Sequence, residues 1–158
     1  MVSFATSTVS KATSTVDRTT VAASSPSSSS LVGVDYIGRL TWYDTGRGAC
    51  GGENGENDAV VAIGWSVFDA AKTSANPNDN PLCGRKIQVS YGERPAMVLE
   101  VVDRCKWERT CVASLFDSMT GTGCGPTDID VSKQAFARLT ALSPEVQGVV
   151  TATWHWTS

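Results

Sequence analysis

Residues 83–105 read CGRKIQVSYGERPAMVLEVVDRC, and this stretch predicts a β-hairpin. Two runs of β-forming residues, 86–91 and 96–102, are separated by a Gly-Glu-Arg-Pro turn. Folding the hairpin about that turn brings Cys83 and Cys105 roughly opposite one another, so we predict a disulfide between them. Disulfides persist in oxidising compartments, and the hairpin therefore predicts a secreted, extracellular protein.

Three further cysteines, Cys50, Cys111 and Cys124, bring the total to five. Because the chain has a single histidine and no C-x-x-C pair, the usual zinc-site spacing is missing, and we expect no metal and no cofactor. We predict that Cys50 pairs with Cys124 and leaves Cys111 as a free thiol. The alternative is that Cys111 takes the place of Cys124.

Short strands separated by turns continue on both sides of the hairpin. We predict them at 37–43, 59–63 and 148–156, with a helical turn at 66–71. The clearest helix is 132–142, which Ser132 can cap and which we expect the following Ser-Pro to end. A mainly β chain with one or two short helices suits a small barrel better than a sheet that alternates with helices.

Length and charge narrow the possible partners. The 158 residues suit one domain, and we expect a monomer. With a net charge of −3 the chain has no basic footprint for nucleic acid. No apolar run is long enough to span a bilayer, so we expect no membrane partner.

Residues 1–36 differ in composition from the rest of the chain. They are dominated by Ser, Thr, Ala and Val and end close to the tract SSPSSSS. Such a segment has too few large apolar residues to offset the entropy lost on ordering, so we predict a disordered leader. The composition fits either O-glycosylation or a plain flexible leader. The folded domain is then expected at 37–158.

Five motifs, in the same order along the chain, carry a resemblance to a known family. They are GRLTWYDTGRGACG at 38–51, NPLCGRKIQVSY at 80–91, VVDRC at 101–105, DIDVSKQAF at 128–136 and GVVTATWHW at 148–156. Their succession resembles the fungal single-domain expansin-like proteins called loosenins. These are related to rare lipoprotein A, to the first domain of expansins and, more remotely, to family 45 endoglucanases. The resemblance implies a six-stranded double-psi β-barrel with an open polysaccharide groove.

The resemblance assigns two carboxylates to that groove as the catalytic candidates. Asp130 matches the aspartate that family members need for wall loosening, and Asp103 matches a second groove carboxylate. A carboxyl shielded by the barrel wall can hold its proton near neutral pH and hydrogen-bond sugar. The alternative for Asp130 is a favourable place before a helix N-terminus. Asp103 ends an apolar strand, where an unpaired charge is costly unless it has a function.

Thr41, Trp42, Tyr43 and Asp44 form the candidate substrate-binding segment. The resemblance places Thr41 and Tyr43 along the groove, although both could be ordinary strand residues. Strand alternation turns Trp42 away from these two. Asp44 lies near the base position of the related endoglucanases, one residue out of register with it, and could equally cap a turn. Hydrolysis is therefore not the expected activity.

Trp154 and Trp156 share one face of the last predicted strand, with His155 on the other. Exposed tryptophans would stack on sugar rings, and buried ones would be barrel core. The second alternative is favoured for residues of this size in a short barrel strand.

Residues 106–123 form an insertion relative to the resembling proteins, and two functional hypotheses depend on it. The first is a non-enzymatic protein that binds and loosens cellulose, chitin, β-glucan or peptidoglycan through Asp103 and Asp130. The second is a protein-binding module, such as a protease inhibitor or effector, for which the insertion is the recognition segment. Lytic cleavage of a glycan is a third, less favoured option.

Overall fold

The computed structural model describes residues 32–106 and 124–157. Most of the predicted leader and of the predicted insertion, including Cys111, lies outside these ranges. The described part begins before the predicted domain boundary at residue 37. Val32 forms a β-bridge with Trp156, and the first strand starts at Tyr36.

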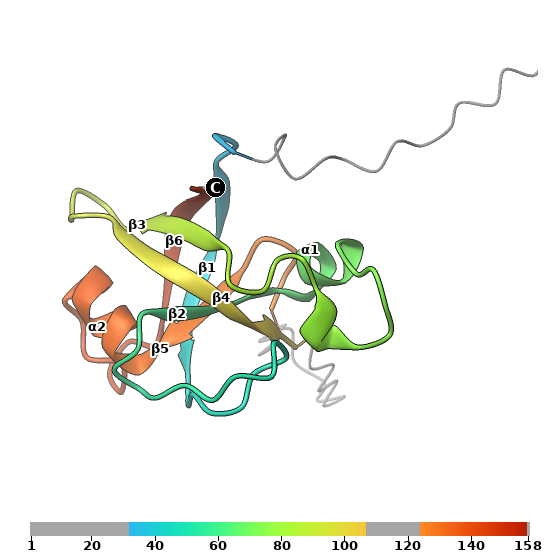
Figure 1. The fold of residues 1–158 in the computed structure, drawn as a ribbon. Helices are drawn as coiled ribbons and strands as arrows, with labels where there is room; N and C mark the ends of the chain where they lie inside the picture. Colours follow the sequence, from blue (N-terminus) through green and yellow to red (C-terminus); the bar gives the residue numbers. More distant parts are fainter. Residues whose placement is uncertain (1–31, 107–123, 158) are drawn as a thin grey trace, which may run out of the picture.

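Six strands close into a barrel in the order β1-β5-β2-β4-β3-β6 (Figure 1). Along the chain the elements are β1 Tyr36–Tyr43, β2 Val60–Gly64, α1 Trp65–Ala70, the 3-10 turn η2 Pro77–Asp79, β3 Lys86–Ser90, β4 Met97–Cys105, β5 Ile129–Ser132, α2 Lys133–Thr140 and β6 Val149–Trp156. The mainly β, six-stranded double-psi barrel with two short helices is thereby confirmed.

Two parallel strand pairs give the barrel its crossed connections. β1 pairs in parallel with β5, and β2 pairs in parallel with β4. β5 was not among the strands predicted individually. It is only four residues long and runs directly into α2, so its inward-facing Ile129 and Val131 offer little alternation to detect. A parallel partner also cannot be inferred from a local turn.

The predicted hairpin forms as β3 and β4, but the predicted disulfide across it is wrong. The register pairs Lys86 with Glu100, so the position three residues before Lys86 faces Asp103. Cys105 lies two residues beyond Asp103, on the part of β4 that pairs with β2. Cys83 and Cys105 therefore do not meet.

Each of the four cysteines of the predicted pairs forms a disulfide, with a different partner from the one expected. Cys50 bonds to Cys83 and Cys105 bonds to Cys124, with Cα–Cα distances of 5.6 and 5.9 Å. The reason is the path of the β1–β2 loop, which crosses over β4 and donates a hydrogen bond from Cys50 N to the carbonyl oxygen of Val102 at 3.1 Å. This crossing brings Cys50 beside Cys83.

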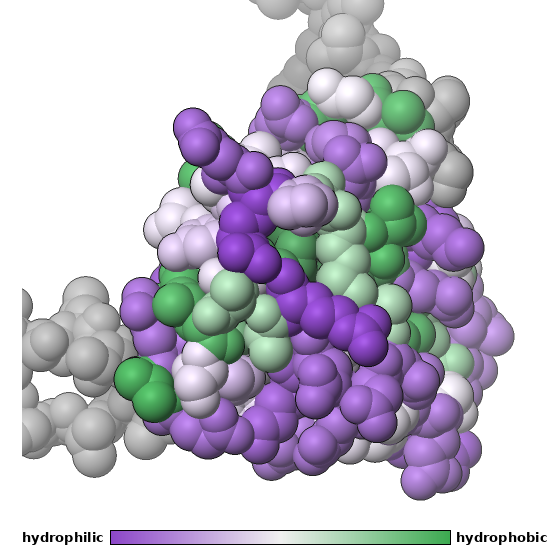
Figure 2. All heavy atoms as spheres, turned by 90° about the vertical axis from the view of Figure 1, so that its left-hand side faces the viewer, coloured by the Kyte–Doolittle hydropathy of each residue, from purple (hydrophilic) through white to green (hydrophobic). Residues whose placement is uncertain are grey.

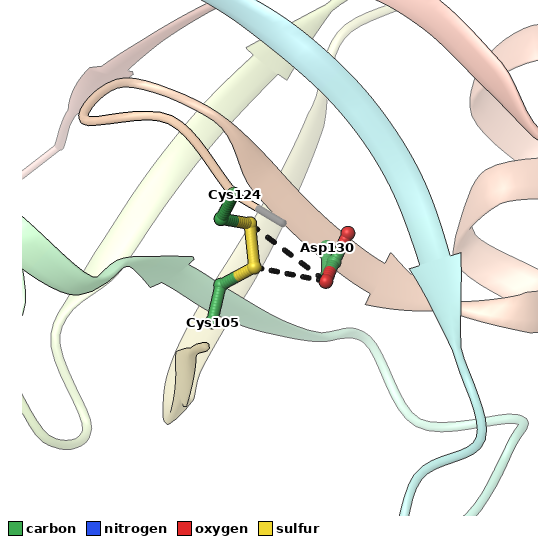
Figure 3. A group of neighbouring side chains, drawn as sticks. All are labelled: Cys105, Cys124 and Asp130. Atoms are coloured by element: carbon green, nitrogen blue, oxygen red, sulfur yellow. Dashed lines mark hydrogen bonds between the residues drawn. A yellow bond between two sulfur atoms is a disulfide. The ribbon is translucent and has the colours of Figure 1, made fainter. Parts of the chain in front are cut away.

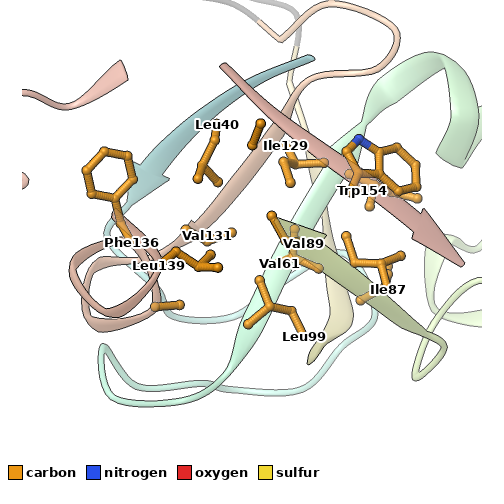
Figure 4. Packing of buried hydrophobic residues seen from close by; sticks show 14 of the residues in the cluster. Leu40, Val61, Ile87, Val89, Leu99, Ile129, Val131, Phe136, Leu139 and Trp154 are labelled. Atoms are coloured by element: carbon orange, nitrogen blue, oxygen red, sulfur yellow. The ribbon is translucent and has the colours of Figure 1, made fainter. Parts of the chain in front are cut away.

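Inward-facing side chains of the strands fill the barrel, and α2 closes one end of it (Figure 4). Trp154 and Trp156 are both fully buried, which confirms that they belong to the core. Phe136 and Leu139 of α2 are buried against the same cluster. The interior is therefore packed with side chains and leaves ligand binding to the outer surface.

Ser132 caps α2 as predicted, and its side-chain oxygen accepts a hydrogen bond from Ala135 N. The helix ends at Thr140, earlier than expected, because Ala141 adopts the left-handed conformation with φ 57°. Among the described helices we find none with the length and apolar character needed to cross a membrane.

Candidate functional site

A row of outward-facing residues crosses four neighbouring strands. Thr41 of β1 is in register with Asp130 of β5, Asp130 with Ala62 of β2, and Ala62 with Asp103 of β4. Adjacent strands lie about 4.8 Å apart, so the Cα atoms of the two aspartates are about 10 Å apart with an alanine between them. The small side chain of Ala62 leaves a hollow between two carboxylates.

That hollow is part of an open pocket of about 440 Å³. It brings together four of the predicted site residues, Asp103, Asp130, Tyr43 and Asp44. Thr41 pairs with Asp130 but does not line the pocket. Cys105, which the sequence indicated as a disulfide residue, also lines the pocket. The remaining lining residues, which the sequence did not indicate, are Gly46, Arg47, Ala62, Arg104 and Lys106. Three of these residues are basic, Arg47, Arg104 and Lys106. No sequence motif indicated them, because they meet only when the β1–β2 loop and the end of β4 come together.

Trp42 does not belong to the pocket. Its side chain packs against the barrel core, as strand alternation predicts. The indole nitrogen donates a hydrogen bond of 3.0 Å to the carbonyl oxygen of Pro144, and Lys133 Nζ lies 5.2 Å from the ring centroid. These contacts join β1 to α2 and the turn after it, so Trp42 has a structural role.

Asp103 attaches the β1–β2 loop to β4. Its Oδ1 accepts hydrogen bonds of 2.7 Å from the backbone N–H groups of Ala49 and Arg104. The loop lies so close to β4 that a Cβ on Gly48 would come within 2.3 Å of the Val102 carbonyl oxygen. Asp103 and Gly48 together fix one wall of the pocket.

Arg104, at the rim, has an ion-pair partner. Its Nε and Nη2 donate to the two carboxylate oxygens of Asp69 at 2.9 and 2.7 Å. The bidentate pair with Arg104 lowers the pKa of Asp69, and Lys72 adds to this effect. The pair connects β4 to α1 and holds the guanidinium group at the pocket edge.

Asp130 is the most perturbed carboxyl of the pocket. Burial in the barrel wall raises its pKa to about 6; the charge of Arg39 opposes this rise, and the charges of Asp128 and Asp103 add to it. At mildly acidic pH a large fraction of Asp130 therefore carries a proton. This agrees with the expectation that a shielded carboxyl holds its proton close to neutral pH.

Asp130 also contacts the Cys105–Cys124 disulfide (Figure 3). Its Oδ2 lies 2.9 Å from Sγ of Cys105 and 3.8 Å from Sγ of Cys124. A disulfide sulfur has no hydrogen to donate, so only the acid form of Asp130 can supply a proton to these contacts. Both sulfurs are committed to the disulfide, so the three side chains are not a set of metal ligands in this oxidised state.

Tyr43 forms another part of the pocket wall. Burial raises the pKa of its hydroxyl well above the usual value, and the nearby charges of Asp103 and Asp130 add to the rise. Its ring packs against a small cluster of Ala62, Cys105 and Cys124. The pocket thus offers a neutral phenol, a carboxyl that titrates near pH 6 and a fixed second carboxylate, which suits polar ligands.

The view from the α2 side shows no single large apolar area on the described residues (Figure 2). Hydrophilic residues cover most of that face, and hydrophobic residues appear between them in small groups (Figure 2). Groups of this kind are ordinary on a soluble protein and do not identify a binding face.

Two kinds of similar protein bear on the site, one similar in sequence and one in fold alone. No family model matches the chain. The papain inhibitor of Streptomyces mobaraensis is 34% identical over 141 residues, which cover 87% of this chain and 82% of that protein. The solved structure of the Streptomyces papain inhibitor is 33% identical with a TM-score of 0.59, and the match covers 80% of this chain and 97% of that one.

The second kind is a bacterial expansin. The structure of Clavibacter michiganensis expansin matches with a TM-score of 0.52 at 19% identity over 79% of this chain and 51% of that one. A mutant of that expansin in complex with cellohexaose matches equally well at 18% identity. At this identity the likeness shows a shared fold, and this chain spans about half of the expansin.

The expected barrel fold is thus shared with an expansin, whereas the finer assignment to loosenins is not confirmed. Identity above 30% across most of both sequences is found with the inhibitor. The chain belongs to the family of the Streptomyces papain inhibitor.

Proposed function

We propose that this protein is a secreted inhibitor that binds papain-like cysteine proteases. The observation that carries the proposal is the 34% identity with the Streptomyces mobaraensis papain inhibitor over 82% of that protein. The alternative hypothesis from the sequence, a protein-binding module on a barrel, is thus preferred to wall loosening. The two disulfides support secretion, because such bonds persist outside the reducing cytosol.

The architecture suits an inhibitor for a physical reason. A closed barrel has no free sheet edge, and two disulfides restrain the loops beside it. A rigid surface loses little conformational entropy when it binds, so more of the contact energy appears as affinity.

The test is a titration of active papain with the oxidised protein, followed by cleavage of a chromogenic peptide. We expect activity to fall with increasing protein, and papain whose catalytic thiol has been blocked with a bulky reagent to bind more weakly. A serine protease serves as the specificity control. Undiminished papain activity at a tenfold molar excess, with no binding by calorimetry, would overturn the proposal.

Polysaccharide binding is a second candidate because the row Thr41–Asp130–Ala62–Asp103 joins the residues that the expansin resemblance selects. Its support is weaker, since the matching expansin, whose mutant was solved with cellohexaose, shares only the fold. The target would be cellulose, chitin, β-glucan or peptidoglycan.

This candidate is tested by retention of the protein on each insoluble polysaccharide and by mass spectrometry of released sugars. Sugars released by wild type and not by Asp130→Asn would indicate a lytic enzyme. Retention without release would support binding or loosening. If the protein is not retained and no sugars are released, this candidate is removed, and the inhibitor proposal is unaffected.

A further inference from the structure

The two disulfides have different surroundings. The Cys50 and Cys83 sulfurs lie near backbone carbonyl oxygens, Val101 O at 3.9 Å and Pro77 O at 3.8 Å. A carbonyl oxygen has no proton to give. The Cys105–Cys124 sulfurs instead contact the Asp130 carboxyl, which can carry one (Figure 3). Of the two bonds, this one has an acid in contact with both of its sulfurs.

The same disulfide borders the pocket. Cys105 is one of the lining residues, whereas Cys124 is not. Both cysteines are otherwise well covered, with exposed fractions of 5% and 6%. A small thiol that enters the pocket would therefore approach Cys105 Sγ, leaving Cys124 Sγ as the departing sulfur.

We propose that Cys105–Cys124 is a thiol-exchange site in which Asp130 gives its proton to the departing sulfur. An incoming thiolate forms a bond to Cys105 Sγ while the Cys105–Cys124 bond breaks, and the electron pair of that bond leaves on Cys124 Sγ. The proton on Asp130 Oδ2, 3.8 Å away, moves to this sulfur and leaves a carboxylate. A second thiol completes the reduction, so the thiol is oxidised and the protein disulfide reduced.

Charged groups from β1, from β4 and from the segment before β5 surround Asp130 and set its protonation. Arg39 on β1 favours the carboxylate, while Asp128, just before β5, and Asp103 on β4 favour the acid. Tyr43, also on β1, is a neutral phenol at neutral pH, and burial raises its pKa further above the usual value. Burial is the largest influence and keeps the acid form populated up to about pH 6.

The proposal rests on the sulfur contacts and the pocket, and does not require the protein to bind a protease. The bond formed by Cys50 and Cys83 is its internal control. Because both bonds lie in one molecule, a single reaction compares them under the same thiol concentration and the same folding conditions.

The experiment treats the folded, oxidised full chain with dithiothreitol between pH 5 and 8.5. Samples are quenched with acid, free thiols are alkylated, and mass spectrometry of peptides follows each pair. Reduction of Cys50–Cys83 should accelerate about tenfold per pH unit, in step with the thiolate. Reduction of Cys105–Cys124 should level off above about pH 6, since the loss of the Asp130 acid form offsets the gain in thiolate.

Asp130→Asn should restore the tenfold rise per pH unit at Cys105–Cys124 and slow its reduction at pH 6 by about 10²-fold, the low end of general acid catalysis. A merely structural role for Asp130 would change the rate without changing the shape of this profile. The proposal is overturned if both disulfides of the wild type show the same pH profile, or if Cys105–Cys124 opens only at the rate of global unfolding. If the variant does not fold, the comparison of the two disulfides in the wild-type protein still tests the proposal.

Discussion

Asp130 occupies a position that is costly for a charge. Its carboxyl lies in the barrel wall beside a disulfide, and Arg39, whose charge favours the carboxylate form, is bonded to Asp128 at 2.8 Å. The raised pKa of Asp130 expresses this cost, because the folded state stabilises the acid and not the carboxylate. Perturbed groups of this kind concentrate at functional sites, although structural charges can show the same behaviour.

Replacing Asp130 with Asn should therefore stabilise the protein at neutral pH. The folded-state pKa of about 6 lies above the unfolded value of 3.8, so wild-type stability from this group is fully present below pH 3.8 and is lost as the pH rises through 6. The variant should be more stable than wild type by at most about 3 kcal/mol at pH 7.5, and the gain should vanish near pH 3.5. Urea unfolding at the two pH values measures this; an equal difference at both would contradict it.

Among the elements, β5 and α2 form one unit in which Ser132 has two contacts. As the last residue of β5 it is fully buried, and its hydroxyl donates to the backbone carbonyl of Asp58. The same oxygen accepts from Ala135 N at 3.4 Å and caps the helix. The Ser132 hydroxyl thus joins the start of α2 to the loop before β2. Asp130 lies two residues before this anchored serine.

Ser132→Ala should lower the free energy of unfolding by about 1–2 kcal/mol, because it removes the helix cap and the hydrogen bond to the Asp58 carbonyl. Ser143→Ala is the matched control. Ser143 is exposed and its hydroxyl donates to the side chain of Glu145 within its own turn, so the change there should stay within about 0.5 kcal/mol. Equal effects of the two substitutions in urea unfolding would contradict the buried role.

At the scale of the whole molecule, the disulfides connect loops to a closed sheet. The Cys50–Cys83 bond spans a sequence separation of 33 residues and holds the β1–β2 loop against the segment that leads into β3. The Cys105–Cys124 bond spans 19 residues and joins the end of β4 to the segment before β5. Both therefore support the walls of the pocket.

Removing Cys50–Cys83 with a double Ser substitution should cost about 3–4 kcal/mol of unfolding free energy in the chain-entropy model. Removing Cys105–Cys124 should cost about 0.5 kcal/mol less, because the closed loop is shorter. Thermal unfolding of the two double variants at one pH compares them. A midpoint unchanged from wild type in either would contradict the prediction for that bond.

Local patterns were sufficient for much of the barrel. The hairpin, the cap at Ser132 and the opposite facing of Trp154 and His155 follow from turn chemistry and from periods of two and 3.6 residues. Asp103 and Asp130 were selected by motif, and their common pocket follows from the strand order. The pairing of the two with Ala62 could not be predicted, because it needs the parallel β2–β4 contact.

The sequence by itself determined which residues face inward, which turns reverse the chain and which carboxylates are candidates, because these depend on neighbours along the chain. Only the tertiary structure decided the partners of the cysteines and the contact of Asp130 with sulfur. The Cys50–Cys83 bond depends on how the β1–β2 loop crosses β4, and the contact of Asp130 with Cys105 depends on how β5 and β4 flank β2. Function was not determined by the barrel either. One fold presents different surfaces to proteases and to sugars, and side chains brought together from distant segments make the difference.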